Sequence, residues 1–388
     1  MSSLSLRRRP PSPAAAPPLE DDDLLSEILL RLPPHPSSLP RASAVSKRWR
    51  SLASDPRFCS RFRLHHRRNA PFLGCFVSDF RHIHFQPAME PPNRLPQDCF
   101  SFPIAPGEGR FLPLGCRHGL ALIFFPGIQL LVWDPVTGEQ HRLDIPPGLD
   151  TEKNLISAAV FRPAGDIHHY QVVLVSNCER QDTRAVASVY SSETGVWGNL
   201  ISTQLPYHDS WVRALMPAVM IGNSLYWLLN ANSEGILEFD LAKGGLAVIP
   251  LPVLDTCTRK CQIWVMLAEG GGLGFLFLTG FCAQSWKRMT NCDGVGSWVP
   301  QRSIELDKLL SLDPETKIWP SIIGYAEDTN MVLLWTSIGI FLVQLESLQF
   351  SKLSEPNNFY RYYPFDGVYT ADKGIHGGRD GAGLLQNT

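Results

Sequence analysis

The sequence lacks an apolar run long enough to cross a membrane as a helix, because its longest such stretch, residues 120–133, is interrupted by Pro126, Gly127 and Gln129. It also lacks an Asn-x-Ser/Thr glycosylation acceptor, and its nine cysteines are an odd number without the spacing of a disulfide framework. Both features favour a reducing compartment. We therefore expect the protein in the cytoplasm and/or the nucleus, with no membrane partner.

The signatures of common active sites are also missing. No Gly-x-Ser-x-Gly nucleophile elbow occurs, and the glycine-rich stretch 270–274 precedes an expected strand rather than the helix that a phosphate-binding loop needs. Cys257 and Cys261 have no second pair at zinc-binding spacing, and His82 and His84 have no cysteine or carboxylate companion. We therefore predict no catalytic residue, no cofactor and no metal site.

Charge is distributed unevenly along the chain. Residues 1–70 contain 13 Lys and Arg against 6 Asp and Glu, whereas the remainder contains 22 against 31. The basic residues are interleaved with a tight apolar pattern rather than forming a run, so no nucleic-acid partner is predicted. The proline-rich residues 1–18 are predicted to be a disordered leader rather than a transit peptide, and the glycine-rich residues 372–388 a disordered tail.

The first ordered part is predicted to be helical. One face carries apolar residues at i, i+3, i+4 and i+7, namely Leu25, Ile28, Leu29 and Leu32. The acidic residues 21–23 suit a helix N-terminus, and Pro33 with Pro34 ends the helix. Leu24 and Leu30 widen the apolar stripe beyond one face. Surplus apolar surface on so small a unit predicts a partner site; the alternative is that this face packs on the rest of the chain.

A second helical segment follows. Ser37 or Ser38 can cap it, and Val45, Trp49 and Leu52 recur at i, i+4 and i+7. The pair Asp55-Pro56 is expected to close the unit. A basic connector then leads into a region of different character.

From Phe72 onward the pattern is typical of an all-β structure. Apolar runs of strand length alternate with clusters of Gly, Pro, Asn and Asp, and no long helix is expected. The runs lie at 72–79, 120–125, 128–134, 170–176, 185–191, 224–230, 273–279, 331–336 and 338–345.

A weak internal repeat runs through this region. Asp134, Ser191 and Asp240 occupy equivalent turns after an apolar strand and are 57 and 49 residues apart. A period of about 50 residues with four strands per unit is typical of a β-propeller of the kelch kind. We expect five or six blades; a two-sheet sandwich is the alternative.

The helical segments carry a recognisable motif. Residues 23–33 read DLLSEILLRLP and residues 45–52 read VSKRWRSL, which resembles the F-box. Two departures from its usual pattern occur. The Leu-Pro pair before the first helix is missing, and Ser46 stands where a cysteine is usual.

The resemblance extends over the β-rich region. The stretches CRHGLAL (116–122), VWDPVTG (132–138), IELDKLL (304–310) and YYPF (362–365) look like the large grass-plant family of F-box proteins with an F-box-associated, propeller-like domain. The resemblance implies a mainly β chain with a small three-helix F-box at 19–60, a linker at 61–71 and a propeller-like substrate-recognition domain at 72–371.

The same resemblance implies a function. An F-box docks on a Skp-family adaptor and through it on a cullin, so the chain is expected to be a non-catalytic substrate receptor of a ubiquitin ligase whose propeller binds an unknown target protein. The adaptor interface and the F-box core together are expected to comprise Leu24, Leu25, Ile28, Leu29, Leu32, Pro33, Val45 and Trp49. One alternative is a scaffold or decoy acting outside the ligase. The other is a propeller enzyme using a pair such as Arg117 and His118.

Overall fold

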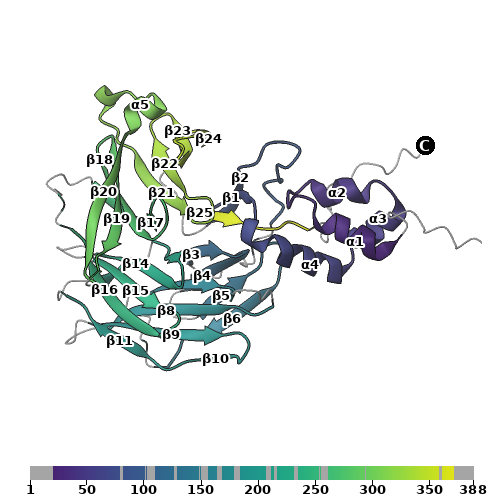
Figure 1. The fold of residues 1–388 in the computed structure, drawn as a ribbon, viewed down its shortest axis with the longest axis horizontal. Helices are drawn as coiled ribbons and strands as arrows, with labels where there is room; N and C mark the ends of the chain where they lie inside the picture. The colour runs from purple at the N-terminus through teal and green to yellow at the C-terminus, as the bar shows by residue number, and fades with distance from the viewer. Residues whose placement is uncertain are drawn as a thin grey trace, which may run out of the picture.

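The computed structural model describes residues 21–370, apart from 79–81, 101, 103–109, 126–128, 148, 150–155, 164–167, 179–183, 207–210, 214–215, 231–234, 253, 255–260, 293 and 358–360. The predicted leader and tail lie outside the described residues. Four N-terminal helices project from one side of a β-propeller (Figure 1). None of the described helices has the length and apolar character needed to span a bilayer.

The helical region consists of four α-helices rather than the three expected. They are α1 (Asp22–Leu30), α2 (Ser38–Ser43), α3 (Lys47–Ala53) and α4 (Pro56–His66), and a short 3-10 turn, η2 (Arg67–Asn69), follows. The pair Asp55-Pro56 begins α4 instead of closing the unit. The Asp55 carboxylate accepts hydrogen bonds from the N–H groups of Arg57 and Phe58, and proline is well tolerated in the first turn.

The first and third helices begin at side-chain caps. Asp21 accepts from the N–H groups of Asp23 and Leu24 at 2.9 and 3.2 Å, as the acidic start predicts. Ser46, the residue in place of the usual cysteine, accepts from the N–H of Trp49 at 3.1 Å and so caps α3. This departure therefore stabilises the local helix.

The β-rich region forms six sheets arranged as the blades of a propeller, which is the upper of the two expected blade numbers and excludes the two-sheet sandwich. Blade 1 contains β3 (Leu112–Arg117), β4 (Leu120–Phe125), β5 (Gln129–Trp133) and β6 (Gln140–Asp144). Blade 2 contains β7 (Ile156–Phe161), β8 (Gln171–Cys178), β9 (Arg184–Ser191), β10 (Val196–Trp197) and β11 (Ile201–Gln204). Blade 3 contains β12 (Trp211–Val212), β13 (Val219–Ile221), β14 (Ser224–Asn230), β15 (Gly235–Asp240) and β16 (Gly245–Pro250).

The remaining blades follow the same antiparallel plan. Blade 4 contains β17 (Cys261–Leu267), β18 (Leu273–Thr279), β19 (Cys282–Thr290) and β20 (Gly296–Glu305). Blade 5 contains β21 (Ser321–Ala326), β22 (Met331–Thr336), β23 (Gly339–Gln344) and β24 (Phe350–Ser354). The short α5 (Leu306–Leu310) and η3 (Pro314–Thr316) connect these two blades.

The sixth blade closes the ring with strands from both ends of the β-rich region. Its order is β2 (Ile83–Pro87), β1 (Phe72–Ser78) and β25 (Arg361–Asp366), so the last strand pairs with the first. β25 also contacts β3 of blade 1 and β21 of blade 5. An aromatic cluster fills this blade, with Phe76 in contact with Phe85, Phe100 and Phe365. The propeller is complete only when β25 is in place.

The predicted repeat corresponds to the turn between the third and fourth strands of a blade. Asp134 accepts from the N–H groups of Val136 and Thr137, and Asp240 accepts from those of Ala242 and Lys243 in the same way. Gly138 follows in a left-handed conformation with φ of 77°, which glycine adopts without strain. The predicted equivalence of the turns at Asp134 and Asp240 is confirmed.

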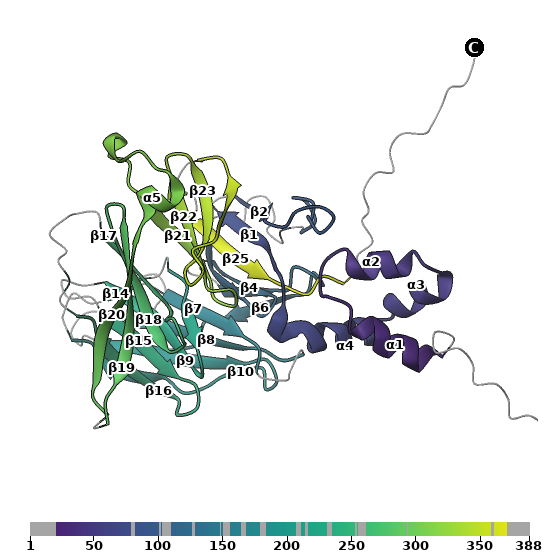
Figure 2. The ribbon, with the colours of Figure 1, turned by 45° about the horizontal axis from the view of Figure 1, so that its top comes forward.

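The helical region is connected to the propeller at more than one point. β25 runs towards α4, and Val368, which follows it, joins the hydrophobic core of the helical region (Figure 2). Arg63 of α4 reaches Thr370, and Ser37 hydrogen-bonds to Asn93 between β2 and β3. The helical region is therefore held against one side of the propeller by two segments, one early in the propeller sequence and one at its end.

Candidate functional site

The predicted adaptor residues separate into two groups. Leu25 and Leu29 are buried, with 0% and 1% of their surface exposed, and belong to the core of the helical region. Leu24 is 48% exposed, Ile28 43% and Val45 62%. Pro33 is also exposed, whereas Leu32 and Trp49 are half-buried at the edge of the core.

The geometry of α1 explains this division. Leu25 and Leu29 lie four residues apart on the face that packs with Phe58 and Phe62 of α4, and Leu24 and Ile28 form the parallel row beside them. Leu30, expected to widen the apolar surface, is buried. The exposed apolar surface of α1 therefore consists of Leu24 and Ile28, which the propeller does not cover.

A groove lies beside the exposed residues Pro33 and Val45. Its apolar lining includes Leu32, Pro33, Val45 and Trp49, which were all predicted to take part in adaptor binding. Pro92 and Asn93, from the connection between β2 and β3, line the same groove. No local sequence pattern predicts these two residues, because they reach the groove only through the tertiary fold.

The contact with Asn93 also explains an unusual helix start. Ser37 does not cap its own helix, α2, with its side chain. Its N–H and hydroxyl both donate to the side-chain oxygen of Asn93, at 3.3 and 2.7 Å. The predicted cap residue thus serves as a link to the propeller.

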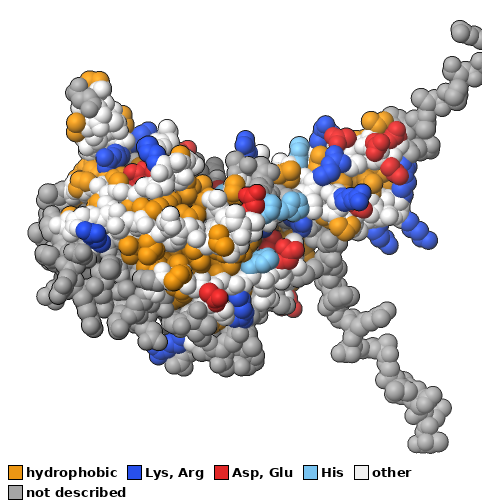
Figure 3. Space-filling view, turned by 90° about the horizontal axis from the view of Figure 1, so that it is seen from below, with side chains coloured by type: hydrophobic (Ala, Val, Ile, Leu, Met, Phe, Trp, Pro, Cys, Tyr) orange, Lys and Arg blue, Asp and Glu red, His pale blue; other side chains and the backbone are white. Residues whose placement is uncertain are grey.

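Charged pairs surround the exposed apolar residues of α1. Glu27 forms ion pairs with Arg61 at 2.6 Å and Arg31 at 3.1 Å, and both guanidinium groups lower the pKa of its carboxyl. Arg48 pairs with Asp22 at 2.7 Å. Figure 3 shows acidic, basic and apolar side chains mixed over this region. Such exposed pairs add little stability but can orient a partner.

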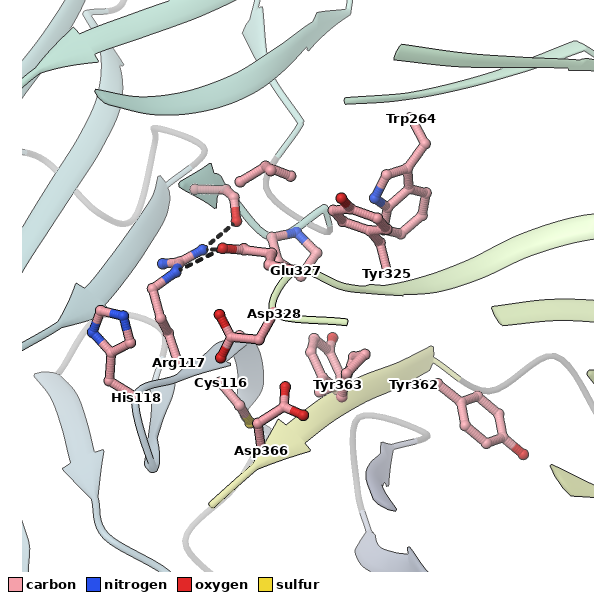
Figure 4. Close-up of a pocket in the computed structure, with 15 residues that line it drawn as sticks. Cys116, Arg117, His118, Trp264, Tyr325, Glu327, Asp328, Tyr362, Tyr363 and Asp366 are labelled. Atoms are coloured by element: carbon pink, nitrogen blue, oxygen red, sulfur yellow. Dashed lines mark hydrogen bonds and ion pairs between the residues drawn. The ribbon is translucent and has the colours of Figure 1, made fainter. Parts of the chain in front are cut away.

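The second candidate site is the channel at the centre of the propeller (Figure 4). Arg117, at the end of β3, forms a buried two-point ion pair with Glu327 and donates to the carbonyl oxygen of Ala218 at 2.7 Å. The N–H of Met220 donates to Glu327 at 3.1 Å. Arg117 also donates to the carbonyl oxygen of Val160 in blade 2 at 3.4 Å, so four blades meet at one ion pair.

His118 belongs to the same turn but faces a different set of partners. Its Nδ1 lies 3.0 Å from the N–H of Arg162 and 3.3 Å from the guanidinium of Arg67. Burial, and then the nearby Arg117, Arg67 and Arg162, lower the pKa of His118 to about 3. A neutral, hydrogen-bonded imidazole of this kind is a structural acceptor.

Two further carboxylates point into the channel beside this ion pair. Asp328 follows Glu327, and Asp366 lies at the end of β25 (Figure 4). Burial raises the pKa of the Asp366 carboxyl well above its usual value, and the charges of Asp328 and Glu327 raise it further. Burial also raises the pKa of Asp328. Carboxyl groups are therefore gathered at this end of the channel, in surroundings that favour their protonated form.

Among the described residues that line the channel, we recognise no nucleophile–base pair. Burial raises the pKa of the Cys116 thiol, which keeps it protonated and unreactive. In the part of the chain that the structure describes, no group of three His, Cys, Asp or Glu side chains is placed to hold a metal ion.

Two family models match the chain. The F-box domain matches residues 21–61, and the family described as "F-box protein At3g26010-like, beta-propeller" matches residues 95–289, about half of the sequence. The chain belongs to this family of F-box proteins. The helical region is thus an F-box followed by the propeller of this family, an architecture typical of non-catalytic adaptors.

Similar solved structures are distant from this F-box protein. They include a chain of the mitotic checkpoint complex (TM-score 0.34, 10% identity, 62% of this chain and 61% of that chain). Two others are extracellular domains of a hybrid two-component system and a one-component system from B. thetaiotaomicron. Their TM-scores are 0.36 and 0.33, their identities 12% and 13%, and each alignment covers 73% of this chain but only 36% and 33% of theirs. At these TM-scores none of the three bears on fold or function. No curated protein matches the sequence.

Three loops between the expected strands, at 177–184, 205–211 and 257–261, are candidates for target binding by their position in the sequence alone. Most of their residues lie outside the described part of this F-box protein. Their role stays a prediction.

Proposed function

We propose that this protein is a substrate-receptor subunit of a Skp–cullin–F-box ubiquitin ligase. F-box domains generally bind Skp-family adaptors, and one observation supports that role here. The F-box completes its own core with Leu25 and Leu29, yet leaves Leu24, Ile28 and Val45 exposed. Exposed apolar side chains on a small, already closed unit favour a protein interface.

In this proposal the chain contributes binding and orientation rather than chemistry. The adaptor contacts the outer row of α1 and the groove at Pro33, Val45 and Trp49, and the cullin bound to the adaptor brings the conjugating enzyme. The propeller holds the target protein. A target lysine is thereby kept at high local concentration near the activated ubiquitin.

The connection between the two domains supports this role. A receptor must hold its target at a defined distance from the adaptor, and the contacts of Val368, Thr370 and Asn93 with the F-box limit relative motion. The F-box is therefore not attached by a flexible tether alone.

The test uses the exposed residues only, so that the F-box still folds. The triple variant Leu24→Ser, Ile28→Ser, Val45→Ser should fail to co-precipitate a Skp-family adaptor that the wild type retains. The matched control is Val196→Ser with Val295→Ser, two exposed valines of the propeller. Unchanged binding by the triple variant, with a native circular dichroism spectrum, would reject the proposal.

A scaffold or decoy outside the ligase is the second candidate, motivated by the missing Leu-Pro pair before α1. The two candidates differ in whether cullin accompanies the adaptor in the co-precipitate. We further propose a grass-plant source, a kelch-like propeller and a location in the cytoplasm and/or the nucleus. The family-like motifs and the odd, scattered cysteines support these points, and fluorescence microscopy of the tagged protein tests the location.

A further inference from the structure

The groove on the F-box is built by both domains of the chain. It has a volume of about 580 Å³. Val45 and Trp49 line it from the helices, and Pro92 and Asn93 line it from the connection between β2 and β3. A groove of this volume is large enough for a few side chains of a bound protein. A partner that docks on the F-box here therefore meets residues of the propeller domain as well.

The connection between β2 and β3 is held in place at this groove. The N–H and the hydroxyl of Ser37 both donate to the side-chain oxygen of Asn93, at 3.3 and 2.7 Å. The N–H of Asn93 donates in turn to the carbonyl oxygen of Glu90 at 2.9 Å, which folds the connection into a turn. Because the groove is formed before a partner arrives, binding does not have to order the connection.

Exposed apolar side chains are gathered at the groove. Val45 has 62% of its surface exposed, and Pro33 and Pro92 are exposed as well. Trp49 is half-buried beside them. Apolar and aromatic side chains that cluster on a concave surface favour a protein partner with apolar side chains of its own.

The charge around the groove is positive. No Asp or Glu occurs at positions 28–54, whereas five Lys and Arg do. Arg31 and Arg48 are paired with acidic residues of α1. Arg41, which lines the groove, and Lys47 form no ion pair with any described residue. This surface therefore complements a partner segment that carries acidic side chains.

We propose that the Skp-family adaptor contacts the propeller domain directly, through an acidic segment that lies in this groove against Pro92 and Asn93. The inference rests on the proposed function, because it takes the adaptor as the partner of the F-box. It adds that the adaptor interface is composite. An adaptor seated in the groove contacts α2, α3 and the connection between β2 and β3 together, so its binding fixes the orientation of the propeller as well as that of the F-box.

The experiment measures the affinity of the full-length protein for the purified adaptor by isothermal titration calorimetry. Asn93→Asp keeps an acceptor oxygen for Ser37 but places a negative charge in the groove, so it should weaken binding by about tenfold. The double variant Arg41→Gln, Lys47→Gln should also weaken binding and should reduce its dependence on salt concentration. The matched control is Asn223→Asp, which adds the same charge to an exposed residue of blade 3 and should leave the affinity unchanged.

Hydrogen exchange supplies a readout that a purely structural role of Asn93 would not change. The amides of residues 93–95 should become more protected when the adaptor binds the wild type. The double variant alters only exposed side chains, so its result holds even where Asn93→Asp changes the local structure of the connection.

Two outcomes would separate this inference from the proposed function. If the wild type binds the adaptor but residues 93–95 gain no protection, or if Asn93→Asp binds as tightly as Asn223→Asp, the composite interface is wrong and the receptor role stands. If the wild type does not bind the adaptor at all, the proposed function fails, and this inference fails with it.

Discussion

Arg117 and Glu327 lie 210 positions apart in the sequence and form an ion pair inside the propeller. Only 8% and 21% of their side chains are exposed. Their remaining hydrogen bonds reach Ala218 and Met220 of blade 3 and Val160 of blade 2. A single pair of charges thus joins blades 1, 2, 3 and 5 in the central channel.

Breaking this buried ion pair should cost much more folding stability than breaking an exposed one. Glu327→Gln leaves the Arg117 charge buried without its counter-charge and should lower the free energy of unfolding by about 3–5 kcal/mol. Urea unfolding followed by tryptophan fluorescence measures this difference. The control Glu355→Gln removes an exposed partner of Lys352 and should change stability by less than about 1 kcal/mol. A loss below that value at Glu327 would contradict the structural role of the pair.

The two rows of leucines on α1 predict opposite outcomes for adjacent substitutions. Leu25→Ala creates a cavity in the F-box core and should lower stability by about 2–5 kcal/mol. Leu24→Ala, one residue earlier, should change stability by at most about 0.5 kcal/mol, because the side chain faces solvent. Hydrogen exchange of the α1 amides compares the two variants. Equal protection in both would mean that the division into core and surface rows is wrong.

His118 predicts a dependence of stability on pH. Its folded-state pKa of about 3 lies below the ordinary value of 6.5, so between these values only the unfolded chain takes up the proton. The free energy of unfolding should therefore fall as pH is lowered through this window, by up to about 1.4 kcal/mol per pH unit from this group. His118→Asn, which suits the left-handed backbone at φ of 53°, removes the titration.

The informative quantity is the difference between wild type and His118→Asn across pH 4 to 7, since the raised pKa values of Asp328 and Asp366 act in the opposite direction in both proteins. A difference that stays constant with pH would show that His118 titrates normally.

Because β25 closes the propeller, truncating a buried side chain of this strand should lower the stability of the protein. Phe365 is fully buried and contacts Phe76 and Phe100, so Phe365→Ala should lower stability by about 3–5 kcal/mol. Phe350→Ala, at a side chain that is 47% exposed, is the matched control. Comparable thermal midpoints for the two variants would argue against the closing role of β25.

Much of the propeller could be predicted from the sequence, because its central strands are buried on both faces. Strands such as β4, with all six residues buried, appear in the sequence as continuous apolar runs between turn residues. The third-to-fourth-strand turns could be predicted because Asp134 and Gly138 act within a few residues. Interactions between residues so close in the sequence can be inferred without knowledge of the fold.

Features that depend on distant contacts could not be predicted. The pair Asp55-Pro56 is compatible with either the end or the start of a helix. It begins α4 because Phe58 and Phe62 of that helix pack on α1. Ser37 looks like an ordinary cap, but its acceptor is Asn93 in another domain. Likewise Asp328 and Asp366 come from different blades, so no local sequence pattern indicates that both line the same cavity.

The position of Val368 has a consequence for biosynthesis. The residue completes the F-box core, and the strand just before it completes the propeller, so neither domain is finished until this part of the chain has left the ribosome. A product released early would lack both a closed propeller and a fully packed F-box. In the proposed receptor role, this arrangement would limit adaptor binding to chains whose propeller is complete.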